Sequence, residues 1–228
     1  MFKKLFLAAI LLCHIALCGA VKIDQSSRQK CSETLMTVIC RGDENAFKQL
    51  LVPDGFAGTL SMFLELCGLT HKDLIAAMAA ELCKELKVDD PQKILNDPAL
   101  FAQAATMGDD VTFVEKNGKY YIFFSVIDHD SKEHVAAVFM IAMANCDPRT
   151  LWEIYTPSRR EKVIKRNGSK EAALALMREV LLEEEKVEIT PALLRDEEYF
   201  GGVMHGLDGK FIQLKGKWYM KFGSGGQP

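Results

Sequence analysis

The residues with the clearest capacity for chemistry lie in one polar segment near the middle of the chain, Asp128-His129-Asp130-Ser131-Lys132-Glu133-His134. Carboxylates and imidazoles are ligands for zinc and similar ions. If a helix starts at Ser131, Asp130 and His134 stand four residues apart and share one face of it. We therefore take Asp128, His129, Asp130 and His134 as candidate metal ligands, and a small metal-dependent hydrolase as one candidate function.

A second interpretation of this segment needs no metal. Asp and Ser serve as turn and N-cap residues where a strand gives way to a helix. No further ligand stands at the spacing of a known metal motif, and the chain has neither a Gly-x-Ser-x-Gly elbow nor a His-Glu-x-x-His helix. We therefore expect no cofactor. The first expectation for function is a non-enzymatic binding or interaction protein.

Four aromatic residues are candidates for binding a ligand. Trp152 and Tyr155 lie in one part of the chain, and Trp218 and Tyr219 lie near its end. Such side chains combine a large apolar surface with a polar group, so they could line a groove, and they could equally pack in a core.

The first twenty residues have the plan of a secretory signal peptide, 1–20. Lys3 and Lys4 precede the apolar run 5–17, and the segment ends in the small residues Gly19 and Ala20. The apolar run is shorter than the ~20 residues of a membrane-spanning helix. We expect cleavage after Ala20, a periplasmic or secreted protein, and no membrane span in the mature chain. Attachment of a lipid at Cys18 is an alternative.

Composition excludes several classes of protein. The chain has 228 residues, of which 49% are hydrophobic, with 28 basic residues against 31 acidic ones. A disordered acidic tail and a strongly basic nucleic-acid binder are both inconsistent with these figures. Because cleavage would also remove Lys3 and Lys4, the formal net charge would change from −3 to −5. We expect no nucleic-acid partner.

The cysteines allow several arrangements outside the cytoplasm. Cleavage would leave five of them, an odd number, which permits at most two disulfides and leaves at least one thiol. Their pairing cannot be deduced from spacing, and buried free thiols are an equally open interpretation. The five are Cys31, Cys40, Cys67, Cys83 and Cys146.

The most informative pattern is an internal similarity between residues 28–124 and residues 132–222. Met36, Asp43 and Pro53 recur 104 residues later, and Met78, Glu85 and Phe101 recur 99 residues later. Asp110, Gly118 and Tyr121 recur 98 residues later. The falling offset places the length differences in loops, as a duplication would. We therefore predict two diverged copies, 21–127 and 128–222, followed by a disordered tail, 223–228.

Each copy has the same predicted elements, which define an α+β fold. Apolar spacing predicts a first helix that ends near Gly42 or Cys146, a short second helix capped by Asp43 or Asp147, and a third after Thr70 or Ser169. A fourth helix is predicted over about 91–105 and 190–203. Asn117-Gly118 and Lys215-Gly216 then predict β-hairpin turns. Each copy should therefore have three to four helices followed by a hairpin, with the copies packed together.

Part of each copy resembles the nuclear-transport-factor-two-like, cystatin-like class of small secreted bacterial α+β domains. The residues that carry the resemblance are Gly42-Asp43, Phe47, Leu50, Pro53 and the strand Gly216-Lys217-Trp218-Tyr219. It covers about a third of each copy and implies no particular functional residue.

These observations leave the partner open. An exported, duplicated chain without catalytic motifs fits an unknown protein or small-molecule partner outside the cytoplasm. Self-association into a homodimer is also open.

Overall fold

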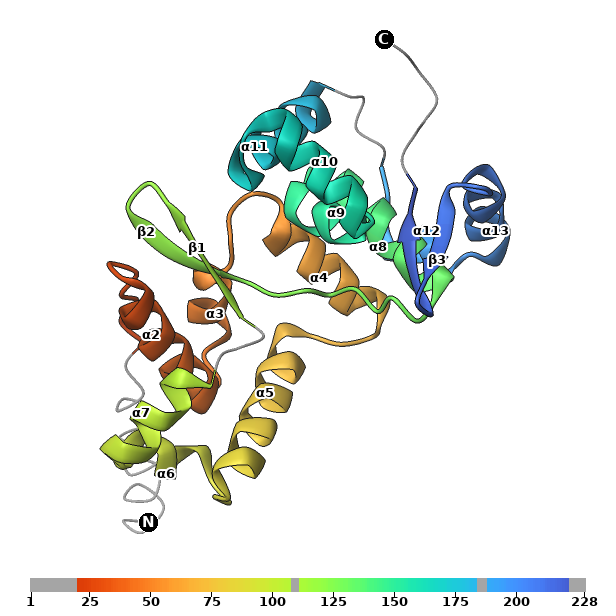
Figure 1. Ribbon diagram of the computed structural model, residues 1–228. Coiled ribbons are helices and arrows are strands. Elements are labelled where there is room, and N and C mark those ends of the chain that lie inside the picture. Colours follow the sequence, from red (N-terminus) through yellow and green to blue (C-terminus); the bar gives the residue numbers. More distant parts are fainter. Residues whose placement is uncertain (1–19, 108–110, 184–187, 222–228) are drawn as a thin grey trace.

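A computed structural model describes residues 20–107, 111–183 and 188–221 (Figure 1). Within these ranges the N-terminal half contains six helices and a hairpin, and the C-terminal half contains the same elements in the same order. In the N-terminal half these are α2 (Arg28–Arg41), α3 (Glu44–Leu50), α4 (Phe56–Leu66), α5 (His71–Leu86), α6 (Pro91–Asn96), α7 (Pro98–Thr106), β1 (Thr112–Lys116) and β2 (Lys119–Phe123). In the C-terminal half they are α8 (Lys132–Ala144), α9 (Pro148–Ile154), α10 (Pro157–Asn167), α11 (Lys170–Glu183), α12 (Pro191–Arg195), α13 (Glu197–Gly206), β3 (Phe211–Leu214) and β4 (Lys217–Met220).

The fold is α+β, as the sequence predicts. Its described strands form two separate antiparallel hairpins, β1–β2 and β3–β4. Asn117 and Gly118 both have positive φ, as do Lys215 and Gly216, which is the geometry of a two-residue hairpin turn. The predicted signal peptide, apart from Ala20, and the predicted tail lie outside the described residues.

Local geometry repeats between the halves. Ser27 and Ser131 cap α2 and α8, and each hydroxyl accepts a backbone N–H three residues on. Gly42, directly after α2, and Cys146, two residues after α8, both have positive φ. Isolated parallel bridges then join Leu51 to Ile122 in one half and Tyr155 to Met220 in the other. In both halves the chain that leaves the second helix therefore pairs with the second strand of the hairpin.

The prediction of three to four helices per copy is wrong, because six precede each hairpin in the described chain. One reason is the predicted fourth helix, which is two helices in each half. Asp97 ends α6 and its carboxylate caps α7, and Asp196 does the same between α12 and α13. Pro98, at the first position of α7, has no N–H to continue the helix before it.

The other reason is α4 and α10, for which the apolar spacing predicts no helix. Helix α4 buries two faces rather than one. Phe56, Leu60 and Leu64 belong to the core of the N-terminal half, whereas Met62 and Phe63 pack against residues of the C-terminal half. A helix that is apolar on two sides lacks the single stripe that marks an amphipathic helix.

Helix α4 also joins the halves. It runs beneath α8 and α9 in Figure 1 and packs against both, and against α12. A Cβ atom at Gly55 would lie 2.3 Å from the backbone oxygen of Asn145, and one at Gly58 would lie 2.2 Å from its side-chain oxygen. The glycines therefore permit close contact between the start of α4 and the end of α8. Arg195 donates hydrogen bonds to the carbonyls of Glu65 and Leu66 at the other end of α4.

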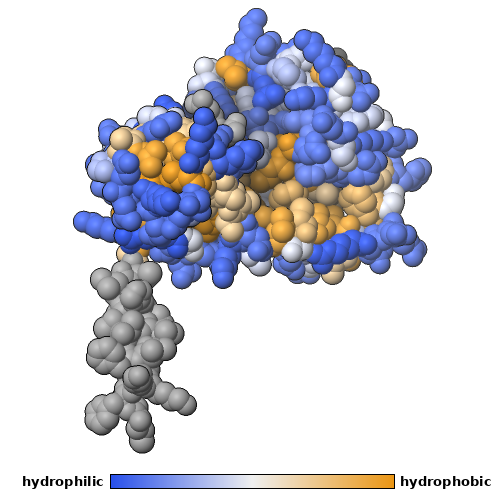
Figure 2. Space-filling model, turned by 90° about the horizontal axis from the view of Figure 1, so that it is seen from below, coloured by the Kyte–Doolittle hydropathy of each residue, from blue (hydrophilic) through white to orange (hydrophobic). Residues whose placement is uncertain are grey.

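Each half has its own buried core. The larger one centres on α2, α3, α4 and β2, and the C-terminal half divides its buried residues among smaller clusters. Apolar residues are also visible in two separate areas of the otherwise mostly hydrophilic face drawn in Figure 2. Within the described ranges, every helix is too short or too polar to cross a membrane. The largest fully buried side chains of the first core are Leu35, Phe47, Leu50, Phe56, Leu60, Ile75, Ile94 and Ile122.

Candidate functional site

The predicted metal ligands lie at the entrance to α8 and make structural contacts. The Asp128 carboxylate accepts the backbone N–H of Asp130 in a tight turn, and the Ser131 hydroxyl caps the helix. The Nδ1 atom of His129 lies 2.6 Å from the carbonyl oxygen of Trp218, and its ring stacks on Tyr219 at 4.5 Å. A carbonyl oxygen only accepts, so this nitrogen carries the proton.

His134 has contacts of its own, with Val126 and with α4. Its Nε2 atom lies 3.0 Å from the carbonyl oxygen of Val126, and its ring packs edge-on against Phe63 of α4. Throughout the described ranges, no three His, Cys, Asp or Glu side chains are placed to hold a metal ion together. Asp128, His129, Asp130 and His134 are thus not gathered into one ligand set.

The four candidate aromatic residues form two clusters. Trp152 is 2% exposed and packs among Ala173 and Leu174, with Lys170 over its ring at 5.9 Å. Tyr155 lies beside it, with the ring centres 6.5 Å apart. Trp218 and Tyr219 instead lie on β4 beside His129 and Lys132. No single groove therefore combines the four rings.

All five cysteines outside the predicted leader are free thiols. Cys31, Cys40, Cys83 and Cys146 are buried, and Cys67 is exposed. Burial raises the pKa of Cys31 and of Cys40 to about 11. The structure thus shows the buried-thiol arrangement that the spacing left open.

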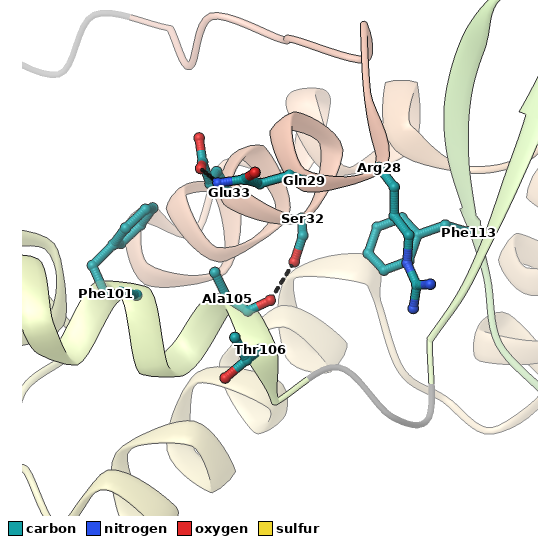
Figure 3. A pocket seen from close by; sticks show the side chains of 9 residues that line it. Arg28, Gln29, Ser32, Glu33, Phe101, Ala105, Thr106 and Phe113 are labelled. Atoms are coloured by element: carbon teal, nitrogen blue, oxygen red, sulfur yellow. Dashed lines mark hydrogen bonds between the residues drawn. The ribbon is translucent and has the colours of Figure 1, made fainter.

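A groove of about 670 Å³ lies between α2 and α7 (Figure 3). Most of its polar groups already have partners. The Ser32 hydroxyl donates to the carbonyl of Ala105 at 2.7 Å, and Glu33 pairs with Lys30 at 2.6 Å. The Arg28 guanidinium lies over the ring of Phe113 at 5.3 Å.

The contact between Arg28 and Phe113 has a counterpart in the C-terminal half. There the ammonium of Lys132 lies over the ring of Phe211 at 5.2 Å. These pairs hold the first helix of each half against the hairpin. Their recurrence favours a structural role for the α2–α7 surface over a ligand-specific one.

A second groove, of about 600 Å³, lies along α10 and α11, and we call it the α10–α11 groove. Its walls are mostly apolar. Leu176 and Val180 are 49% and 48% exposed, although both are large aliphatic side chains. The lining residues are Met143, Leu151, Tyr155, Arg159, Val163, Arg166, Asn167, Leu176, Met177, Val180 and Leu181.

The polar groups of the α10–α11 groove are placed by one face of α10. Arg159, Val163 and Arg166 follow the i, i+4, i+7 spacing of a single helical face. Tyr155 lies at the Arg159 end; burial raises the pKa of its hydroxyl, and the positive charge of Arg159 opposes that shift. No carboxylate of the described residues lies within salt-bridge distance of Arg159 or Arg166. The groove thus has apolar walls and a positive rim.

The equivalent helix of the N-terminal half, α5, lines a smaller groove of about 180 Å³. Met78 and Leu82 of α5 correspond to Met177 and Leu181 of α11, and α7 packs against both α2 and α5. In the C-terminal half the corresponding helix, α13, packs against α12, and α12 packs against α4. The sequence alone contains one sign of this difference: Glu81 of the N-terminal half aligns with Val180, an apolar residue on an exposed surface.

Comparisons with known proteins give no relative from which to transfer a role. No protein-family model, no curated protein and no solved structure matches the chain.

Proposed function

We propose that the protein is an exported, non-enzymatic binding protein that holds an apolar ligand in the α10–α11 groove. The observation that carries this proposal is the half-exposed pair Leu176 and Val180 on the wall of a groove of about 600 Å³. Binding sites for small molecules are usually concave and mostly apolar, in this range of volumes.

The proposal includes a tandem duplication. The identical order of elements, the paired caps, the two parallel bridges and the two cation–aromatic contacts all support it. Two copies of one unit can diverge, one keeping a small groove of about 180 Å³ with Glu81 on its wall and the other widening it to about 600 Å³ with Val180 there. The leader-like segment 1–20 supports export, and the mass of the secreted chain tests it: cleavage elsewhere than after Ala20, or a lipid on Cys18, would contradict this part.

An uncharged dye whose fluorescence rises in apolar surroundings tests the binding function. We expect the processed protein to bind it with a single class of site. Val180→Glu places a carboxylate in the groove and should weaken binding at least tenfold. The N-terminal half has Glu81 at the corresponding position, so the substitution is compatible with this type of helix.

Leu182→Glu is the matched control, because Leu182 is on the same helix, is 55% exposed and does not line the groove. It should bind the dye as the unaltered protein does. Equal binding by all three proteins, or binding by none, contradicts the proposed function.

A further inference from the structure

Building on the proposed function, we propose that the natural ligand of the α10–α11 groove is a single acyl chain with an anionic head group. The apolar walls of the groove indicate that the ligand has an acyl chain. Met143 and Met177 contribute flexible thioether side chains, which adapt to irregular ligand surfaces. A long, unbranched chain matches a groove that runs along two helices.

The positive charge around the groove indicates that the head group of the ligand is anionic. Helix α10 has five basic residues and a single acidic one. Arg160 already pairs with Glu153 at 2.9 Å, on the side facing α9. Arg159 and Arg166 face the groove instead, about 10 Å apart along the helix axis. This positive potential favours an anionic ligand and disfavours a cationic one.

Arg159 is the better placed of the two arginines to hold the head group. It lies close enough to the Tyr155 hydroxyl to affect its pKa, and Tyr155 also lines the groove. A guanidinium pairs with a carboxylate or a phosphate through two parallel hydrogen bonds. The head group would lie beside Arg159, and the acyl chain would extend along Met177 and Val180. Arg166 would attract the anionic head group from a longer distance.

Calorimetric titration with four twelve-carbon amphiphiles, all below their micelle concentrations, tests this assignment. We expect dodecanoate and dodecyl phosphate to bind more tightly than dodecanol, and dodecyltrimethylammonium to bind least. Whichever of the first two binds more tightly identifies the head group as a carboxylate or a phosphate. Binding only to anionic vesicles, with no binding of the monomeric amphiphiles, would overturn the proposal.

Two charge-neutralising variants separate a head-group contact from a general effect of charge. Arg159→Gln should weaken binding of dodecanoate about fivefold, as for a solvent-accessible ion pair, and leave dodecanol unchanged. Lys162→Gln removes the same charge from α10 at a position outside the groove and should change neither affinity.

The outcomes distinguish this inference from the function on which it rests. If dodecanol and dodecanoate bind equally and Arg159→Gln has no effect, the anionic head group is wrong, while binding of an apolar ligand stands. If the neutral dye and every amphiphile fail to bind, the proposed function is wrong as well. A dimer in solution that Val180→Glu dissociates would show that a second copy covers the groove and would overturn the assignment.

Discussion

At the scale of single residues, the aspartates that cap the second helix of each half have pKa values shifted in opposite directions. Asp43 caps α3, and hydrogen bonds from the backbone N–H of Ala46 and its neighbours lower the pKa of its carboxyl group. Asp147 caps α9 in the same way but is fully buried beside α4, and burial raises its pKa. The difference arises because α4 covers the second cap.

We predict that Asp147→Asn changes how stability depends on pH. In the folded protein Asp147 keeps its proton at pH values above 3.8, the pKa of an unfolded aspartate. The free energy of unfolding should therefore fall as pH rises from about 3.8 through the pKa of the folded state. Asparagine still caps the helix but does not ionise. Urea unfolding from pH 4 to pH 8 should therefore show less loss of stability with rising pH in the variant than in the unaltered protein.

Asp43→Asn is the matched control for this prediction. Because the folded pKa of Asp43 is lowered, its contribution to stability is present above the unfolded pKa and is lost as pH falls below about 3.8. Its variant should therefore be less stable than the unaltered protein by a constant amount from pH 4 to pH 8, and this difference should shrink only in acid. Identical pH profiles for the Asp147 and Asp43 variants would contradict the assigned burial.

The cysteines give a second prediction at this scale. Only a thiolate reacts readily with a disulfide reagent, and burial raises the pKa of Cys31 and Cys40 to about 11. At pH 8 we expect one fast-reacting thiol among the five described cysteines of the processed protein, the exposed Cys67. Cys67→Ser should abolish the fast phase. A fast phase of more than one thiol would contradict the structure.

Sequence predicts local features of single residues better than their surroundings. The caps at Asp43, Thr70 and Asp147 and the turn at Asn117-Gly118 are correct, because capping and turn geometry depend on near neighbours. The burial of Asp147 depends on α4, nearly a hundred residues earlier in the chain. The Asp128–His134 cluster likewise has metal-binding residue types, but its imidazoles bond to backbone carbonyls, that of His129 to Trp218 in a distant part of the chain and that of His134 to nearby Val126.

At the scale of elements, α4 and α10 are the helices that the pattern of apolar residues did not reveal. Helix α4 is apolar on two faces, and α10 has no buried residue at all. A single buried stripe is the basis of sequence prediction, and neither helix has one. The α10–α11 groove was missed with α10, although Tyr155 and the contrast between Glu81 and Val180 pointed to it.

We predict that Gly55→Ala destabilises the protein more than Gly42→Ala. Both glycines have positive φ, so each substitution should cost about 1 kcal/mol of backbone strain. Only the Cβ atom at position 55 meets another backbone, 2.3 Å from the Asn145 oxygen, whereas position 42 has open space. Overpacking should add about 2 kcal/mol at position 55, measured by urea unfolding. Equal costs would show that α4 does not approach α8 this closely.

At the scale of the whole molecule, one carboxylate links the two halves. Asp54, just before α4, accepts hydrogen bonds from Lys116 at the end of β1 and from Arg178 of α11. Its side chain is 14% exposed, and the charge of Arg149 also acts on this region. The duplicated pattern of the sequence predicts two similar units but not this connection, since Asp54 pairs with a residue 124 positions away.

We predict that Asp54→Ala lowers the free energy of unfolding by about 1–3 kcal/mol, because it leaves Lys116, Arg178 and Arg149 facing one another without their shared anion. The matched control is Asp208→Ala, which removes a carboxylate 3.8 Å from Lys132 whose side chain is 77% exposed. Exposed pairs contribute little, so this control should change stability by less than about 0.5 kcal/mol.

Because Asp54 joins the halves, its loss should also separate their unfolding into two transitions in calorimetry. A single unshifted transition would show that α4 alone holds the halves together.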